Sequence, residues 1–137
     1  MIIIGKVILA IDPGSQKCGI AIVNEDGKLL EKSVITTDSL LSSIKQLMNQ
    51  HSIQLIVIGD RTKSKFVREL LGMLELPIEI IDENNSSREG RYRYLQENSR
   101  WWQKLLPIGL RTPDKPYDDY VAVILAERFL SQRKINN

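Results

Sequence analysis

The change of hydrophobic period along the chain most constrains its fold. Apolar residues in the first part come in short runs over residues 6–11, 18–23 and 28–36, which predicts three strands. The first run is continuous, as expected for a central strand covered on both faces. Turn-forming residues separate the runs, Asp12-Pro13-Gly14-Ser15 before the second and Asn24-Glu25-Asp26-Gly27 before the third. We therefore expect an antiparallel meander of three strands.

Helical spacing alternates with shorter apolar runs from residue 37 onward. The pattern predicts helices over about 37–48, 62–74, 86–95 and 117–132, and strands over 55–58 and 77–81. Residues 98–116 contain two Trp and three Pro, so we expect mostly loop there, with one helical turn. The order β-β-β-α-β-α-β-α-α predicts an α/β fold: a mixed five-stranded sheet, three strands antiparallel and two parallel, with helices on both faces.

Length and composition indicate one domain. The 137 residues suffice for one core, which we place at residues 1–132, with 133–137 as a frayed polar tail. The single Cys and single His exclude an internal disulfide and argue against zinc held by such ligands. The N-terminal apolar stretch is too short to span a membrane, is broken by Lys6 and lacks the flanks of a signal peptide. We expect a cytoplasmic protein without a membrane partner.

Acidic residues follow the predicted strands where each strand ends. Asp12, Asp60 and the pair Asp82-Glu83 each come directly after a last apolar residue. Ligand sites in such sheets lie at the carboxyl ends of the strands, and a buried carboxylate is costly unless it is hydrogen-bonded, paired or bound to metal. For Asp12 the residues alone fit a turn-capping role before Pro-Gly equally well.

Three segments resemble the RuvC and YqgF resolvase-like nucleases. Residues 11–23, Ile-Asp-Pro-Gly-Ser-Gln-Lys-Cys-Gly-Ile-Ala-Ile-Val, are similar to the first-strand motif of that family. Residues 80–90 are similar to the YqgF pattern Asp-Glu-Arg-x-Thr-Thr, and residues 118–130 to its closing helix, which starts with Asp and continues with Ala-rich apolar residues. Actin-like ATPases share a turn like the first motif, but that fold needs two such domains. The three motifs occur in the family's order, and the distance from the first to the last spans nearly the whole chain.

The resemblance implies a ribonuclease H-like fold and a metal-dependent endonuclease that hydrolyses phosphodiester bonds. It implies a pair of Mg²⁺ or Mn²⁺ ions, with Asp12, Glu83 and Asp118 as ligands. Asp60 is a fourth catalytic candidate and the alternative to Glu83 as third ligand. For Asp119 we expect helix capping. Four-way (Holliday junction) DNA and precursors of small-subunit ribosomal RNA are both open as substrates.

The chain departs from the patterns of both groups. Asn84 stands where the YqgF pattern has Arg. Lys115 stands where RuvC has His or Asp, and this departure brings the chain closer to YqgF than to RuvC. Residues 58–64, Ile-Gly-Asp-Arg-Thr-Lys-Ser, resemble the Gly-x-x-Thr turn of YqgF-like domains in larger RNA-binding proteins. The departures keep a second class open, a nucleic-acid-binding module that has the fold and lacks catalysis.

Basic residues cluster between residues 86 and 113, which suits a phosphate backbone, although a solvated helix face explains the charge alone equally well. We expect Lys63, Arg88 and Arg91 to contact structured RNA or branched DNA, and Arg93 to face water or pair with Glu97. The oligomeric state, monomer or homodimer, is left open.

Four other residues have mainly structural interpretations. We expect Cys18 to be a buried apolar residue and His51 to cap a helix C-terminus. Trp101 and Trp102 are candidates to stack on bases, but we expect at least one of them to pack against the sheet.

Overall fold

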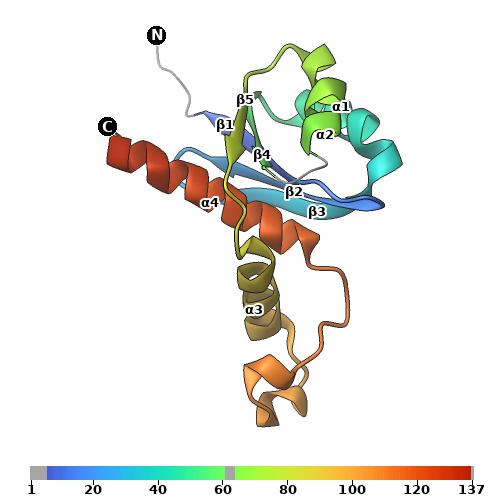
Figure 1. The fold of residues 1–137 in the computed structure, drawn as a ribbon, viewed down its shortest axis with the longest axis vertical. Helices are drawn as coiled ribbons and strands as arrows, with labels where there is room; N and C mark the ends of the chain where they lie inside the picture. Colours follow the sequence, from blue (N-terminus) through green and yellow to red (C-terminus); the bar gives the residue numbers. More distant parts are fainter. Residues whose placement is uncertain (1–5, 61–63, 137) are drawn as a thin grey trace.

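A central sheet of five strands organises the protein, and the computed structural model describes residues 6–60 and 64–136. The strand order is β3-β2-β1-β4-β5 (Figure 1). Strand β1 pairs antiparallel with β2 and parallel with β4, β2 pairs antiparallel with β3, and β4 pairs parallel with β5. The predicted mixed sheet is confirmed. The strands are β1 (Val7–Asp12), β2 (Lys17–Asn24), β3 (Leu29–Thr36), β4 (Ile53–Gly59) and β5 (Ile78–Ile81).

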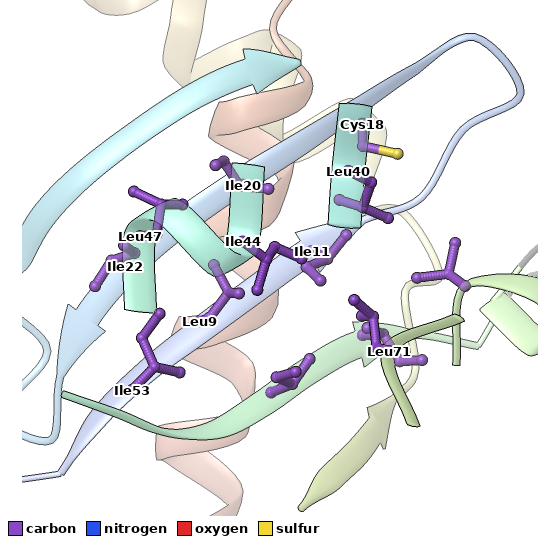
Figure 2. Close-up of a cluster of buried hydrophobic side chains, with 13 residues drawn as sticks. Leu9, Ile11, Cys18, Ile20, Ile22, Leu40, Ile44, Leu47, Ile53 and Leu71 are labelled. Atoms are coloured by element: carbon purple, nitrogen blue, oxygen red, sulfur yellow. The ribbon is translucent and has the colours of Figure 1, made fainter. Parts of the chain in front are cut away.

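Helices cover both faces of the sheet, as predicted (Figure 1). Helices α1 (Leu40–Gln50) and α2 (Ser64–Leu71) lie on one face, and the long helix α4 (Asp118–Asn136) crosses the other. Successive side chains of β1 alternate between the faces: Leu9 contributes to the core under α1, shown in Figure 2, and Ala10 packs toward α4. This two-sided burial explains the continuous apolar run at the start of the chain.

Helix α3 (Ser86–Asn98) packs against α4 and extends away from the sheet (Figure 1). The chain then forms two short 3-10 turns, η3 (Gln103–Leu105) and η4 (Ile108–Leu110), where we expected one helical turn. Residues 99–116, which connect α3 to α4, are called the arm below. Because the arm does not return to the sheet, both Trp side chains are exposed, Trp101 by 78% and Trp102 by 47%. The expectation that one of them packs against the sheet is wrong.

Smaller expectations are mostly confirmed. Cys18 is fully buried, and the backbone N–H of His51 donates to the carbonyl of Leu47 at 2.8 Å, closing α1. Two further 3-10 turns are η1 (Thr37–Ser39) and η2 (Gly72–Leu74).

Helix α4 continues to Asn136, through most of the tail that we expected to be frayed, since those residues include neither Pro nor Gly. Among the described helices, none is both long and apolar enough to cross a membrane.

Candidate functional site

Asp12 ends β1 between two glycines on the neighbouring strands. On one side it pairs directly with Gly19 of β2. On the other side Ile11 pairs with Ile58, so Asp12 lies next to Gly59 at the end of β4. Strand alternation places all three positions on the face that α4 covers, in line with buried residues such as Ala10.

The two glycines allow acidic segments to approach the sheet on either side of Asp12. A Cβ atom on Gly19 would overlap the backbone carbonyl of Asp118, at the start of α4. A Cβ atom on Gly59 would overlap the carboxylate of Glu83. Only glycine leaves this room. The fold therefore brings Asp12, Glu83 and the first residue of α4 to one edge of the sheet, which we call the acidic edge.

Glu83 is the most buried of these acids, with a residue exposure of 1%. Its carboxylate lies over Gly59, and its backbone N–H donates to Asp60 Oδ1 at 3.3 Å. Asp60 itself is exposed, so it holds the main chain of Glu83 from outside. Asp82 Oδ1 accepts the N–H of Asn84 at 2.9 Å, a turn-capping role.

Arg128 of α4 ties the loop of Glu83 to the rest of the fold. Its guanidinium donates to the carbonyl of Asp82 at 2.9 Å and to the Glu89 carboxylate at 2.9 Å. One side chain of α4 therefore holds both the end of β5 and the start of α3. This contact helps to fix the main chain on the N-terminal side of Glu83.

The two neighbouring acids at the start of α4 have different surroundings. Burial raises the pKa of Asp118, the charge of Asp119 raises it further, and Lys17 opposes both. Asp119 is held by Lys32 of β3, whose Nζ lies 2.9 Å from Asp119 Oδ2 and 4.2 Å from the ring centroid of Tyr120. Burial opposes the charge of Lys32, but the hydrogen bond and charge of Asp119 outweigh it and raise the pKa of Lys32. Asp119 therefore joins α4 to β3, which goes beyond the capping role that we expected.

The acids at this edge suit only certain metals and certain kinds of site. Carboxylate oxygens are ligands for Mg²⁺ and Mn²⁺. Within residues 6–60 and 64–136, no three His, Cys, Asp or Glu side chains lie close enough together to hold a metal ion. The residues therefore fit a metal held by one or two carboxylates and completed by water and substrate phosphate. They do not fit a closed cage of protein ligands.

The basic residues considered for contact with nucleic acid differ in their exposure and in their partners within the protein. Arg88 is exposed, near the start of α3. The Arg91 guanidinium donates to the carbonyl of Arg111 and is half-buried, so it supports the arm. Arg93 makes two hydrogen bonds of 2.9 Å to Glu127 of α4, because α3 packs on that helix. The side chain of Arg93 reaches solvent, with an exposure of 38%, but the expected pairing with Glu97 is wrong because its partner is Glu127. Lys63 lies outside the described residues.

The sequence analysis missed the part played by Gly19 and Gly59. A glycine inside a strand pattern signals a close approach by another segment. This signal was present at Gly19, inside the predicted strand 18–23, whereas Gly59 directly follows the predicted strand 55–58 and is included in β4 only in the structure. The supporting role of Asp60 had no comparable signal, because a strand-end acid that ligates metal and one that accepts a backbone N–H occupy the same place in a sequence.

Comparisons with known proteins concern the family and the fold of the chain. A family model described as the Tex protein YqgF-like domain matches residues 6–89. Transcriptional accessory protein Tex of Neisseria gonorrhoeae and an uncharacterized protein of Neisseria meningitidis serogroup A are each 33% identical over 72 residues. Each match covers 48% of this chain and 9% of the relative, so the chain spans under a tenth of their length.

A solved structure extends the likeness to nearly the whole chain. T. thermophilus RuvC, solved in complex with a Holliday junction substrate, aligns with a TM-score of 0.64 and 12% sequence identity. The alignment covers 96% of this chain and 97% of that one. At this identity the likeness concerns the fold, and it confirms the expected ribonuclease H-like architecture.

Proposed function

Because the chain belongs to the family of Tex protein YqgF-like domains, we propose that it is a divalent-metal-dependent endonuclease acting on structured nucleic acid. The observation that carries the proposal is the acidic edge. The carboxylate of Glu83 lies over Gly59 beside Asp12, and α4 brings Asp118 against Gly19 on the other side. Carboxylates gathered at the carboxyl ends of central strands are suited to position a cation at a substrate phosphate.

The residues at the edge have distinct proposed roles. Asp12, Glu83 and Asp118 would hold Mg²⁺ or Mn²⁺ with one or two of these carboxylates at each ion, while water and substrate phosphate complete the coordination. Asp60 keeps the main chain of Glu83 in place through its contact with the backbone N–H. The metal, when bound, supplies an activated water and stabilises the leaving oxygen. Arg88, exposed on the helix that follows Glu83, contacts the phosphate backbone.

The proposed substrate is nucleic acid with secondary structure. The RuvC relative was solved with a Holliday junction, and the curated relative Tex is a transcriptional accessory protein. Branched DNA and structured RNA, such as a ribosomal RNA precursor, are therefore the two substrates to compare side by side.

A second function is favoured by one specific observation. The described acids do not form a group of three that could hold a metal by themselves, and Asn84 and Lys115 depart from the patterns of related nucleases. A module that binds nucleic acid without cutting it would have this arrangement. The experiment below separates the two functions.

The test is cleavage of a four-way DNA junction and a structured RNA in Mg²⁺ or Mn²⁺, by wild type and Asp12→Asn. We expect wild-type cleavage to stop in chelator, and Asp12→Asn to lower the rate at least about 100-fold while the fold persists by circular dichroism. The effect follows from losing a carboxylate that holds the metal. Asp119→Asn, a carboxyl-to-amide change at the same edge, is the matched control and should keep metal-dependent cleavage. Equal cleavage by Asp12→Asn and wild type would remove the assignment. Salt-sensitive binding without any cleavage would establish the binding module.

A salt titration tests the phosphate contact independently. Arg88→Ala should reduce the slope of log K against log salt by roughly 0.7–0.9, to a similar extent for unrelated sequences, since phosphate contacts do not read bases. Lys45→Ala removes the same charge from an exposed position on α1, which lies on the face of the sheet opposite α4. This variant should leave the slope unchanged. A flat salt response of the wild type with both ligands would remove nucleic acid as a partner.

A further inference from the structure

The arm carries most of its large apolar side chains on the outside. Trp101 and Leu105 are each 78% exposed, Leu110 is 68% exposed and Trp102 is 47% exposed. Large apolar residues grouped on a surface mark a binding site more often than scattered ones do. The arm also projects from the body of the protein at the far end of α3 (Figure 1), where a ligand can reach it.

Polar groups hold the arm together from within. Gln103 is only 3% exposed; its Oε1 accepts the backbone N–H of Arg100 at 2.9 Å and its Nε2 donates to the carbonyl of Thr112 at 2.9 Å. Arg111 Nε donates to the carbonyl of Leu106 at 3.1 Å. Together with Ile108, which packs against the cluster of Tyr94, Leu95 and Tyr120, these hydrogen bonds hold the arm, which leaves its exposed apolar side chains available to a ligand.

The charge of the arm selects among possible ligands. Residues 99–116 include four basic residues and one acidic residue, Asp114. Asp114 pairs with Arg100 at 3.1 Å, which leaves an excess of positive charge. Two copies of the arm would repel each other, whereas a phosphate backbone would be attracted. Aromatic side chains beside basic ones are the combination that binds unpaired bases by stacking.

Helix α3 connects the arm to the acidic edge, and exposed basic, aromatic and polar side chains follow one another along one of its faces. Arg88, Tyr92 and Gln96 are exposed and spaced four apart, so they share one face. Tyr92 is 48% exposed. The helix begins three residues after Glu83 and has 13 residues, which corresponds to a length of about 20 Å.

We propose that the arm is a stacking platform for unpaired bases, with Trp101 and Trp102 as the stacking side chains. The inference rests on the proposed function for the nature of the ligand and deepens it. The substrate carries single-stranded nucleotides roughly 20 Å from the phosphate at the acidic edge, and α3 guides the strand between the two.

The experiment compares a blunt duplex with the same duplex carrying a short single-stranded tail. Trp101 and Trp102 are the only tryptophans in the chain, so intrinsic fluorescence reports on the arm without a label. We expect the tail to quench this fluorescence and to tighten binding at least about five-fold, as one stacked base does. In Trp101→Ala/Trp102→Ala the tailed and blunt duplexes should bind equally, and the affinity for the blunt duplex should be kept. Leu29→Ala/Leu30→Ala removes two exposed apolar side chains of β3 and should keep the preference for the tail.

The outcomes separate the platform from the proposed function. A tail that changes neither affinity nor fluorescence overturns the platform, as does a preference that survives in the double tryptophan variant. A dimer in sedimentation that the same variant converts to monomer would assign the arm to a second copy of the chain instead. If the blunt duplex binds and is cut while the tail has no effect, only the platform fails. If neither duplex binds at any salt concentration, the proposed function fails as well.

Discussion

The acidic edge and the arm each depart from the usual distribution of residues in a folded protein, in opposite directions. At the acidic edge a carboxylate is buried, that of Glu83. In the arm large apolar side chains face the solvent, Leu105 and Trp101 foremost. Buried charge and grouped exposed apolar surface are the two distributions that carry information about function. The buried carboxylate is one to which we assign the metal, and the exposed side chains of the arm are those to which we assign unpaired bases, so the two proposals rest on opposite departures.

The two regions are supported in different ways. The acidic edge is built into the core, between Gly19, Gly59 and the start of α4, so changes there disturb the sheet. The arm is held by the hydrogen bonds of Gln103 and by α3, so its outward side chains can change without disturbing the fold. Each prediction below tests this difference, beginning with the largest expected effect.

A leucine in the core between α4 and the sheet and a leucine in the arm should differ most in their effect on stability. Leu125 of α4 is fully buried against the sheet, and Leu105 of the arm is 78% exposed. Leu125→Ala should lower the free energy of unfolding by about 2–5 kcal/mol, because it leaves a cavity. Leu105→Ala should change it by less than about 0.5 kcal/mol. Urea titrations followed by circular dichroism measure both, and a cost at Leu105 similar to that at Leu125 would show that the arm folds around its leucines.

Gly59→Ala tests the room that the edge provides. The new Cβ atom would occupy the place of the Glu83 carboxylate, so we expect a loss of about 1–3 kcal/mol in stability together with weaker metal-dependent cleavage. Gly72→Ala is the matched control, since among the described residues its added Cβ would meet no other segment of the chain within 4 Å. A Gly59→Ala variant with wild-type stability and cleavage would mean that Glu83 is free to move and is not positioned by β4.

The sequence predicted the sheet well and the contacts between side chains poorly. The five strands, their mixed antiparallel and parallel pairing and the helices on both faces were predicted from the hydrophobic period, the turn residues and the order of the elements, and the likeness to RuvC confirms the resulting fold. The acids were found by their place after strands, and their metal-binding role stays a prediction. Arg93 was assigned to Glu97 because both lie on one predicted helix, whereas its partner, Glu127, comes from α4. Such a contact depends on how two helices pack, which one-dimensional spacing does not encode.

The exposure of the two tryptophans also depends on helix packing that the sequence pattern does not encode. We expected at least one of the two tryptophans to pack inward, because burial of an aromatic side chain is strongly favourable. Here α3 carries the segment away from the sheet, and Trp101 lies in solvent. The direction in which a helix leaves the core is set by its packing on α4, and this was beyond reach of the sequence pattern.

Ion pairs give the next comparison between the two regions. Lys32 and Asp119 pair near the acidic edge with side-chain exposures of 29% and 13%, whereas Arg100 and Asp114 pair in the arm with 66% and 40%. Asp119→Ala should cost about 1–3 kcal/mol, because it leaves a half-buried ammonium without its carboxylate. Asp114→Ala should cost less than about 1 kcal/mol, since water and salt screen an exposed pair. Thermal unfolding of the two variants side by side measures the difference, and equal costs would contradict it.

Substitution of Asp118 is expected to have the smallest effect on stability. The pH dependence of this effect is more informative than its magnitude. Burial and the charge of Asp119 raise the pKa of Asp118 in the folded protein, with Lys17 opposing. The folded state therefore holds the proton more tightly than the unfolded state, and stability falls as pH rises from about 4, the ordinary pKa of an aspartate, through the raised value. Asp118→Asn removes the carboxyl that titrates. The free energy of unfolding of the variant should therefore rise relative to that of the wild type across this pH range, and the difference should stay constant at higher pH. The gain should stay below about 1 kcal/mol, because the carboxyl is only half-buried and solvent screens it. Urea titrations at several pH values in chelator measure it, with Asp114→Asn in the arm as a control that should follow the wild type. A variant that loses stability relative to wild type as pH rises would show that the folded protein favours the charged carboxylate of Asp118.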